Sequence, residues 1–146
     1  MGDQILSDIK VIDLTWYIAG AYCTKTFADY GAEVIKVERP GQGDPARMME
    51  PFLGDDPHPD KSLLFSHLNL NKLGITLNLK TGQGLEILKE LVKDADVLVE
   101  SFRPGTMEGL GLSYEILEKI NPKLVMTSIS NFGQTGPYRD LSLIHI

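Results

Sequence analysis

The stretch IKVIDLTWYIAGAYCTKTFADYGAEVIKVE, residues 9–38, predicts a strand, a helix and a second strand in succession. Its first apolar run is Ile9–Leu14, and its last is Glu33–Glu38, where apolar residues alternate as in a strand. Between them, Ala19–Tyr30 has a helical pattern and stops at Gly31, a residue type that commonly ends helices. Strand, helix and strand in this order favour a parallel pair joined by a crossover helix.

The same alternation continues toward the C-terminus. Further strands are expected at Ile75–Leu79, Asp96–Glu100 and Leu124–Ser130, and further helices at Gly82–Lys93 and Tyr114–Ile120. The runs VLVE and LVMTSIS are almost continuously apolar, which is typical of strands buried on both faces of a sheet. We therefore expect an α/β fold: a Rossmann-like, open, mostly parallel sheet with helices on both faces.

One segment interrupts this rhythm. Residues Pro40–Lys61 are rich in proline, glycine and aspartate and have little periodicity, so they are expected to form a long loop. Loops of this length are usually functional or part of an interface.

Composition narrows the classes of protein. The 146 residues carry a net charge of −6 without an extended basic block, which disfavours nucleic acid as a partner. No apolar run approaches the roughly 18 residues needed to span a bilayer, so no membrane partner is expected. The single Cys23 and the absence of a visible signal peptide fit a cytoplasmic protein. The three histidines are scattered and cannot combine with one cysteine into a convincing metal site.

Cationic side chains stand next to the predicted strands. Arg39 follows the second strand and Arg103 the fourth, so both are expected at the carboxyl edge of the sheet, where open α/β sheets bind ligands. Two arginines suit phosphate groups, although solvated surface charges are the alternative interpretation. Phe102 is placed either to stack on a base or to cap the core. The first turn, DLTWYIAGAY, lacks G-x-G-x-x-G and gives little support to an ordinary NAD site.

Four motifs, in order and spacing, resemble those of family III CoA-transferases, the group typified by carnitine and formate CoA-transferases. The motifs are IKVIDLTWYIAGAY, then GAEVIKVERPGQGD, then LNLNKLGITLNLK, and finally DVLVESFRPG with NFGQTGPYRD. Together they extend over residues 6–140. The resemblance implies the CoA-binding large domain of that family.

The resemblance also implies an activity. Such enzymes move CoA from an acyl-CoA to a carboxylic acid through an aspartyl acyl-anhydride and an enzyme–CoA thioester, and they form interlocked homodimers. Similar α-methylacyl-CoA racemases share the CoA-binding frame but transfer a proton, and they remain an alternative. A non-catalytic nucleotide-binding module is the alternative from another class.

Ten residues are expected to bind coenzyme A, on the resemblance and on the position of the arginines. Ser101 stands where an asparagine is commoner, and Gly109 where some relatives have arginine, so two contacts of the family are altered. The ten are Trp16, Ile18, Ala19, Arg39, Asn69, Asn71, Lys72, Ser101, Phe102 and Arg103.

No catalytic residue is expected within the chain. The resemblance implies a nucleophilic aspartate in a G-D-x-x-x-G context beyond residue 146, and Asp13, inside a buried-strand pattern, is a poor substitute. Residues 1–140 are therefore expected to form the N-terminal part of the large domain, with an atypical tail at 141–146 and with the rest of the large domain and the small domain absent. Such a fragment is expected to be inactive alone.

Overall fold

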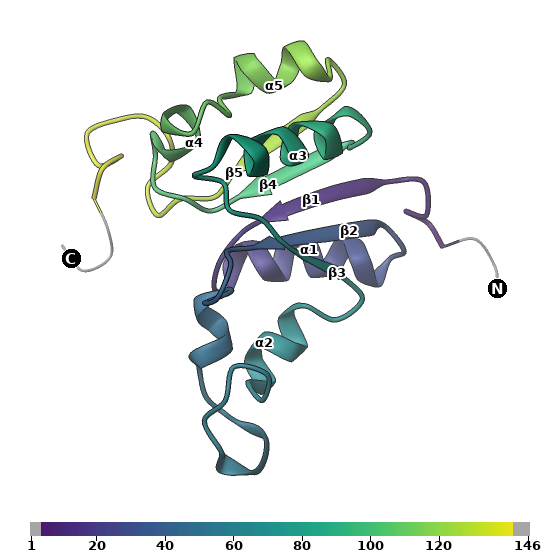
Figure 1. The fold of residues 1–146 in the computed structure, drawn as a ribbon, viewed down its shortest axis with the longest axis vertical. Coiled ribbons are helices and arrows are strands. Elements are labelled where there is room, and N and C mark those ends of the chain that lie inside the picture. The colour runs from purple at the N-terminus through teal and green to yellow at the C-terminus, as the bar shows by residue number, and fades with distance from the viewer. Residues whose placement is uncertain (1–3, 142–146) are drawn as a thin grey trace.

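A five-stranded sheet forms the centre of the computed structural model, which describes residues 4–141. Its strand order is β3-β2-β1-β4-β5, and every neighbouring pair is parallel (Figure 1). The predicted open α/β sheet is confirmed, and the described sheet is parallel throughout. The strands are β1 (Lys10–Leu14), β2 (Glu33–Glu38), β3 (Leu73–Thr76), β4 (Val97–Glu100) and β5 (Val125–Ser128).

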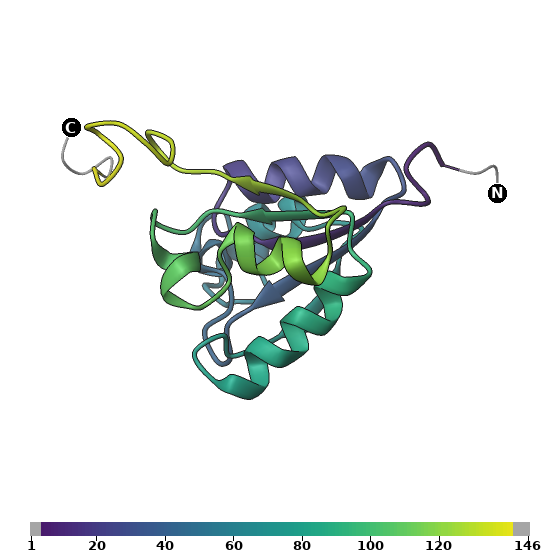
Figure 2. The same ribbon diagram turned by 90° about the horizontal axis from the view of Figure 1, so that it is seen from above.

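Helices cover both faces of this sheet. Helix α1 (Ala19–Asp29) packs on one face, whereas α3 (Gly82–Lys93) and α5 (Tyr114–Ile120) lie on the other (Figure 2). All three were predicted, with α1 one residue shorter than expected. Thr81 begins α3 by accepting a hydrogen bond from the Gly84 amide through its hydroxyl, as a helix N-cap should.

The alternation of side chains along the strands produces two apolar cores. Val11 of β1 packs on the α1 side with Val34 and Val99, while the next residue, Ile12, joins Leu88 on the other side. Successive residues of a strand point to opposite faces, so each strand contributes to both layers. The larger core is the one beneath α3 and α5.

Two short helices were not predicted. They are α2 (Leu63–Leu68) and α4 (Thr106–Gly109), of six and four residues. Such lengths are too short for a helical repeat of apolar residues to show in the sequence, which needs a window of about 11 residues or more. The predicted third strand was also misplaced, because β3 begins at Leu73 rather than Ile75.

The proline-rich segment predicted as a loop contains only two single-turn 3₁₀ helices, η1 (Pro45–Met48) and η2 (Leu53–Asp55). Its end is tied to its beginning by Ser62, whose hydroxyl contacts the carbonyl oxygens of Ala46 at 2.9 Å and Met49 at 2.7 Å. The first part of the loop is therefore fixed against the start of α2. Among the helices of residues 4–141, none has both the length and the apolar character that a bilayer crossing requires.

Candidate functional site

The loops that follow β1, β2 and β4 meet at the carboxyl edge of the sheet. The guanidinium carbon of Arg39 lies 4.7 Å from the centre of the Trp16 ring, and Trp16 meets Phe102 edge to face with ring centres 5.7 Å apart. A cation over an indole ring is attracted by the ring's electron density. Three residues predicted for the site, each from a different loop, thus form one cluster.

Ser101 joins two of these loops. Its hydroxyl oxygen accepts a hydrogen bond from the Trp16 amide at 2.8 Å. The side chain that stands in place of the commoner asparagine is therefore engaged with the backbone of the first turn.

The first turn leads directly into α1. Tyr17 has φ of 62°, in the left-handed region, and the next residues, Ile18 and Ala19, are exposed. Ile18 is the N-cap of α1 and supplies no side-chain acceptor to the first amides of the helix. Unpaired amides and the helix dipole make such a helix start favourable for an anion.

Arg103 lies at the same edge but outside this cluster. It lines a cavity of 290 Å³ at the ends of β4 and β5, together with Arg139, Glu100 and Ser128. Arg39 follows β2, on the other side of β1. The two arginines therefore share the edge of the sheet, as predicted, but belong to separate groups of side chains.

Glu100 is buried at the end of β4. Burial raises the pKa of its carboxyl group, an effect only partly offset by hydrogen bonds from Ser128 and from the Phe102 amide.

Of the other predicted residues, Lys72 directs its side chain into the interior, and Asn69 is half-buried beside it. The Lys72 side chain is 1% exposed, and its Nζ is 2.9 Å from Asp13 Oδ2, Asn69 Oδ1 and the Ala21 carbonyl oxygen. Burial lowers the pKa of Lys72, and the neighbouring Asp13 offsets part of this effect. Asn71 is exposed and donates to Asp29 at 3.0 Å.

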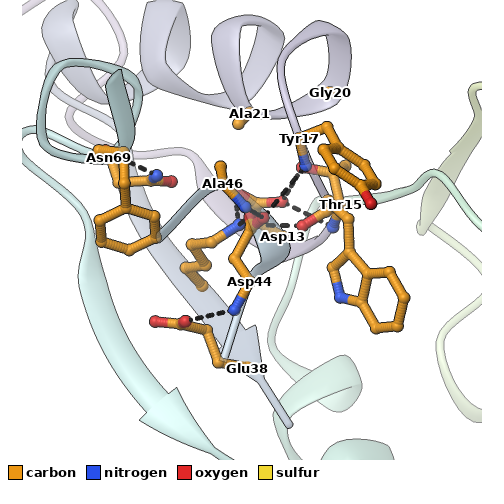
Figure 3. A network of polar contacts seen from close by, with 12 residues as sticks. Asp13, Thr15, Tyr17, Gly20, Ala21, Glu38, Asp44, Ala46 and Asn69 are labelled. Atoms are coloured by element: carbon orange, nitrogen blue, oxygen red, sulfur yellow. Dashed lines mark hydrogen bonds and ion pairs between the residues drawn. The ribbon is translucent and has the colours of Figure 1, made fainter. Parts of the chain in front are cut away.

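Beneath the start of α1 is a buried polar network that the sequence did not reveal (Figure 3). Asp13 is fully buried; Oδ1 accepts from the Thr15 amide and hydroxyl, and Oδ2 accepts from the Thr24 hydroxyl at 2.7 Å. Burial alone would raise the pKa of Asp13, but Lys36, Lys72 and these hydroxyl donors outweigh it and hold the pKa below its ordinary value. The carboxylate is therefore charged and completely engaged.

Lys36 and Asp44 extend this network toward the loop after β2. Lys36 Nζ is 2.9 Å from Asp44 Oδ2 and donates to the Thr15 carbonyl oxygen at 2.9 Å. Asp44 Oδ1 accepts from the amides of Tyr17 at 3.1 Å and Ala46 at 2.9 Å. These contacts join the loop after β2 to the first turn.

A second ion pair anchors the same loop. Arg47 binds Glu38 through two N–H groups, each 2.7 Å from a carboxylate oxygen, and stacks over the Phe65 ring. Burial raises the pKa of Glu38, but the hydrogen bonds from Arg47 reverse the effect and leave the pKa below its ordinary value. Three charged residues of the VIKVE and GD motifs belong to this network: Lys36, Glu38 and Asp44. Their place in those motifs was the one feature of the sequence that could have indicated it.

Fold and edge together define a doubly wound α/β protein whose carboxyl edge combines a cation, stacked aromatic rings and an uncapped helix start. A sequence model described as CoA-transferase family III matches residues 6–143, and the chain belongs to that family.

Relatives and solved structures agree with this assignment. The chain is 46% identical to a succinyl-CoA–D-citramalate CoA-transferase of Chloroflexus aurantiacus, over 92% of this chain and 33% of the relative. It is 50% identical to an acetyl-CoA:oxalate CoA-transferase of Acetobacter aceti, over 88% of this chain and 32% of the relative. A CAIB/BAIF family protein of Brucella suis superposes with a TM-score of 0.85 at 38% identity, over 94% of this chain and 36% of that structure. The chain thus spans about a third of the length of the curated relatives it matches.

Proposed function

We propose that this chain forms the coenzyme A-binding part of a CoA-transferase, an enzyme that moves CoA from an acyl-CoA to a carboxylic acid. The observation that carries the proposal is the Arg39–Trp16–Phe102 cluster beside the uncapped start of α1. Coenzyme A presents an adenine ring and several phosphates, which require an aromatic surface and anion-binding groups close together. The names of the relatives, which pair an acyl-CoA with citramalate or oxalate, support the same class of reaction.

Arg39 has the geometry for the phosphate role. Its Nε donates to the Gly43 carbonyl oxygen at 3.2 Å, which orients the guanidinium group, and the residue is exposed. The remaining N–H groups of the guanidinium are suited to bidentate contact with a phosphate. Ile18 and Ala19 stand at the start of α1, where no side chain caps the first amides of the helix.

The covalent chemistry of the proposed reaction belongs to residues beyond 146. Asp13 and Asp44 are the aspartates nearest the cluster, but both are buried and bound to lysine side chains. A carboxylate held in this way is engaged by its neighbours and shielded from a thioester. We propose that a nucleophilic aspartate from another part of the enzyme completes the site, and that the described residues belong to a larger CoA-binding domain of an interlocked homodimer.

Calorimetric titration of the chain with CoA tests the binding role. Arg39→Ala should weaken binding by about 10- to 150-fold, corresponding to the loss of a hydrogen bond to a charged group, about 1.5–3 kcal/mol. The matched control is Lys123→Ala, which removes an exposed cation from the turn before β5, at the opposite edge of the sheet, and should leave the affinity unchanged. Equal affinities for wild type and Arg39→Ala would remove Arg39 from the site.

A further inference from the structure

We propose that Lys36 and Asp44 are positioning residues that hold the first turn, Thr15–Ala19, in the conformation that binds CoA. The proposal rests on the proposed function for its ligand. The two side chains are 2% and 0% exposed, so they act through the turn and not by touching a ligand.

The turn contains a backbone conformation that needs support. Tyr17 has φ of 62°, in the left-handed region, which is unfavourable for an L-residue with a side chain. Tyr17 is 51% exposed as a residue and therefore gains little from packing. Strained backbone of this kind persists only where the surroundings determine it.

The support comes from side chains of three other segments. The Thr15 carbonyl accepts from Lys36 of β2, the Trp16 amide donates to Ser101 after β4, and the Tyr17 amide donates to Asp44. Three consecutive residues are thus fixed by groups distant in sequence. Figure 3 shows the backbone nitrogen of Tyr17 directed at the Asp44 carboxylate below the start of α1.

Asp44 is itself held in place. Its amide donates to Glu38 Oε2 at 2.8 Å, and its Oδ1 also accepts from the Ala46 amide. Gly43 permits this approach, since it has φ of +64° and an added Cβ would lie 2.6 Å from Glu38 Oε2. The segment between Glu38 and Ala46 is therefore rigid against β2, and so is the acceptor it offers to Tyr17.

The same contacts set the position of the binding cluster. Trp16 precedes the constrained Tyr17, and Arg39, which stacks on Trp16, begins the loop that carries Asp44. Loosening the Asp44–Tyr17 contact should free both partners of the stack at once. Trp16 and Arg39 would then have to become ordered during binding. The entropy lost in ordering them would lower the affinity for CoA.

A buried ion pair is poorly explained by stability alone. Lys36 is balanced by Asp44 at 2.9 Å and by Asp13 at 4.0 Å, a costly arrangement to remove from water. Such pairs are often neutral for stability compared with apolar residues of the same shape, and some serve to select one conformation. The left-handed turn is the conformation that this pair selects.

The closing experiment combines CoA titration with amide hydrogen exchange in the 146-residue chain. Asp44→Ala removes the acceptor of the Tyr17 amide and should weaken CoA binding at least tenfold, with faster exchange in peptides covering residues 15–19. Asp44→Asn keeps an oxygen for that amide and should lose less affinity. Val92→Ala, on the fully buried face of α3, lowers stability without touching the turn and should leave both the affinity and the exchange of residues 15–19 unchanged.

Each outcome bears on the proposal. Unchanged exchange at residues 15–19 in Asp44→Ala, unchanged affinity, or equal losses in Asp44→Ala and Asp44→Asn would overturn it. If Asp44→Ala does not fold, Lys36→Met carries the same test, because it removes the donor to Thr15 and keeps a side chain of similar length. If the wild-type chain does not bind CoA, the proposed function fails, while the exchange measurement still decides whether Asp44 holds the turn.

Discussion

Gly20 lies where the start of α1 passes over Thr15. A Cβ at position 20 would come within 2.4 Å of Thr15 Cβ and Cγ2. Thr15 cannot turn away without cost, because its hydroxyl donates to Asp13 at 2.6 Å. Gly20→Ala should therefore lower the free energy of unfolding by about 1–3 kcal/mol, the usual range for overpacking. Urea denaturation measures the loss.

Gly109→Ala is the matched control for this change. Gly109 is in α4, and no atom lies within 4 Å of a Cβ built there. Alanine is favoured over glycine in a helix by roughly 0.5–1 kcal/mol, so this variant should be as stable as wild type or slightly more stable. A loss in Gly109→Ala equal to that in Gly20→Ala would contradict the steric explanation.

Asp13 makes stability depend on acidic pH. Its pKa is lowered in the fold, so the folded state favours the charged form; this stabilisation is present above the ordinary value of 3.8 and is lost as pH falls through the lower folded value. At pH 7, Asp13→Asn should cost about 3–5 kcal/mol, because Lys36 and Lys72 lose a buried partner. The difference in the free energy of unfolding between wild type and variant should close below pH 3.8.

Denaturation curves at several pH values measure this difference. The exposed Asp8→Asn serves as control and should differ little from wild type at pH 7. If the difference in unfolding free energy between wild type and Asp13→Asn stays constant down to pH 3, the substitution acts through shape rather than charge.

Some residues of the site could be predicted from the sequence, and others could not. Arg39 was predicted because it directly follows a strand, and Phe102 because it stands beside Arg103 and in the family motif; the structure places both side chains against Trp16. Lys36 and Asp44 were missed, since a charged residue in an alternating strand ordinarily indicates the solvent face. The partner that buries Lys36 comes from a loop without periodicity, and only the folded chain brings the two together.

At the scale of elements, α3 shows how one helical face supports the sheet. Leu88 is 0% exposed and packs in the core with Ile12 and Leu98, whereas the preceding Ile87 is 43% exposed. Leu88→Ala should lower the free energy of unfolding by about 2–5 kcal/mol through lost burial and a cavity.

Ile87→Ala is the control, with the same kind of truncation one residue away. This variant should lose less than half the unfolding free energy that Leu88→Ala loses, because part of the Ile87 side chain is already in contact with water. Equal losses in the two variants, measured by thermal or urea denaturation, would show that α3 is rotated from the orientation described.

The elements that the sequence predicted well are those with a repeated signal. Gly82–Lys93 gives three turns of helix with a consistent apolar face, and its bounds were predicted correctly. The short α2 and α4 have no such repeat, and β3 is a four-residue edge strand whose outer residues are exposed. The order of the strands was not predicted, because it depends on which crossovers pack best and not on any one segment.

At the scale of the whole molecule, the layer between the sheet and α1 has two parts. Toward the amino ends of the strands it is apolar, with Val11, Val34 and Ala28 in contact. Toward the carboxyl ends it becomes the polar network of Asp13 and Lys36. The apolar part stabilises the fold, while the polar part fixes the turn that we propose binds CoA.

This division leads to a prediction for the whole chain: residues 1–146 should bind CoA without forming a covalent intermediate. The buried Asp13 and Asp44 are bound to lysines, and Asp96 accepts from the Lys10 amide at the opposite edge of the sheet. Covalent catalysis needs a positioned and accessible nucleophile, and losing one costs several orders of magnitude in rate. The purified chain should therefore give a calorimetric signal with CoA but no acyl-enzyme by mass spectrometry after incubation with an acyl-CoA and candidate acids. Hydroxylamine, which cleaves acyl-anhydrides and thioesters, identifies any adduct of the expected type. A hydroxylamine-sensitive adduct on a carboxylate of residues 4–141 would show that the nucleophile is local, and would require the network beneath α1 to open during catalysis.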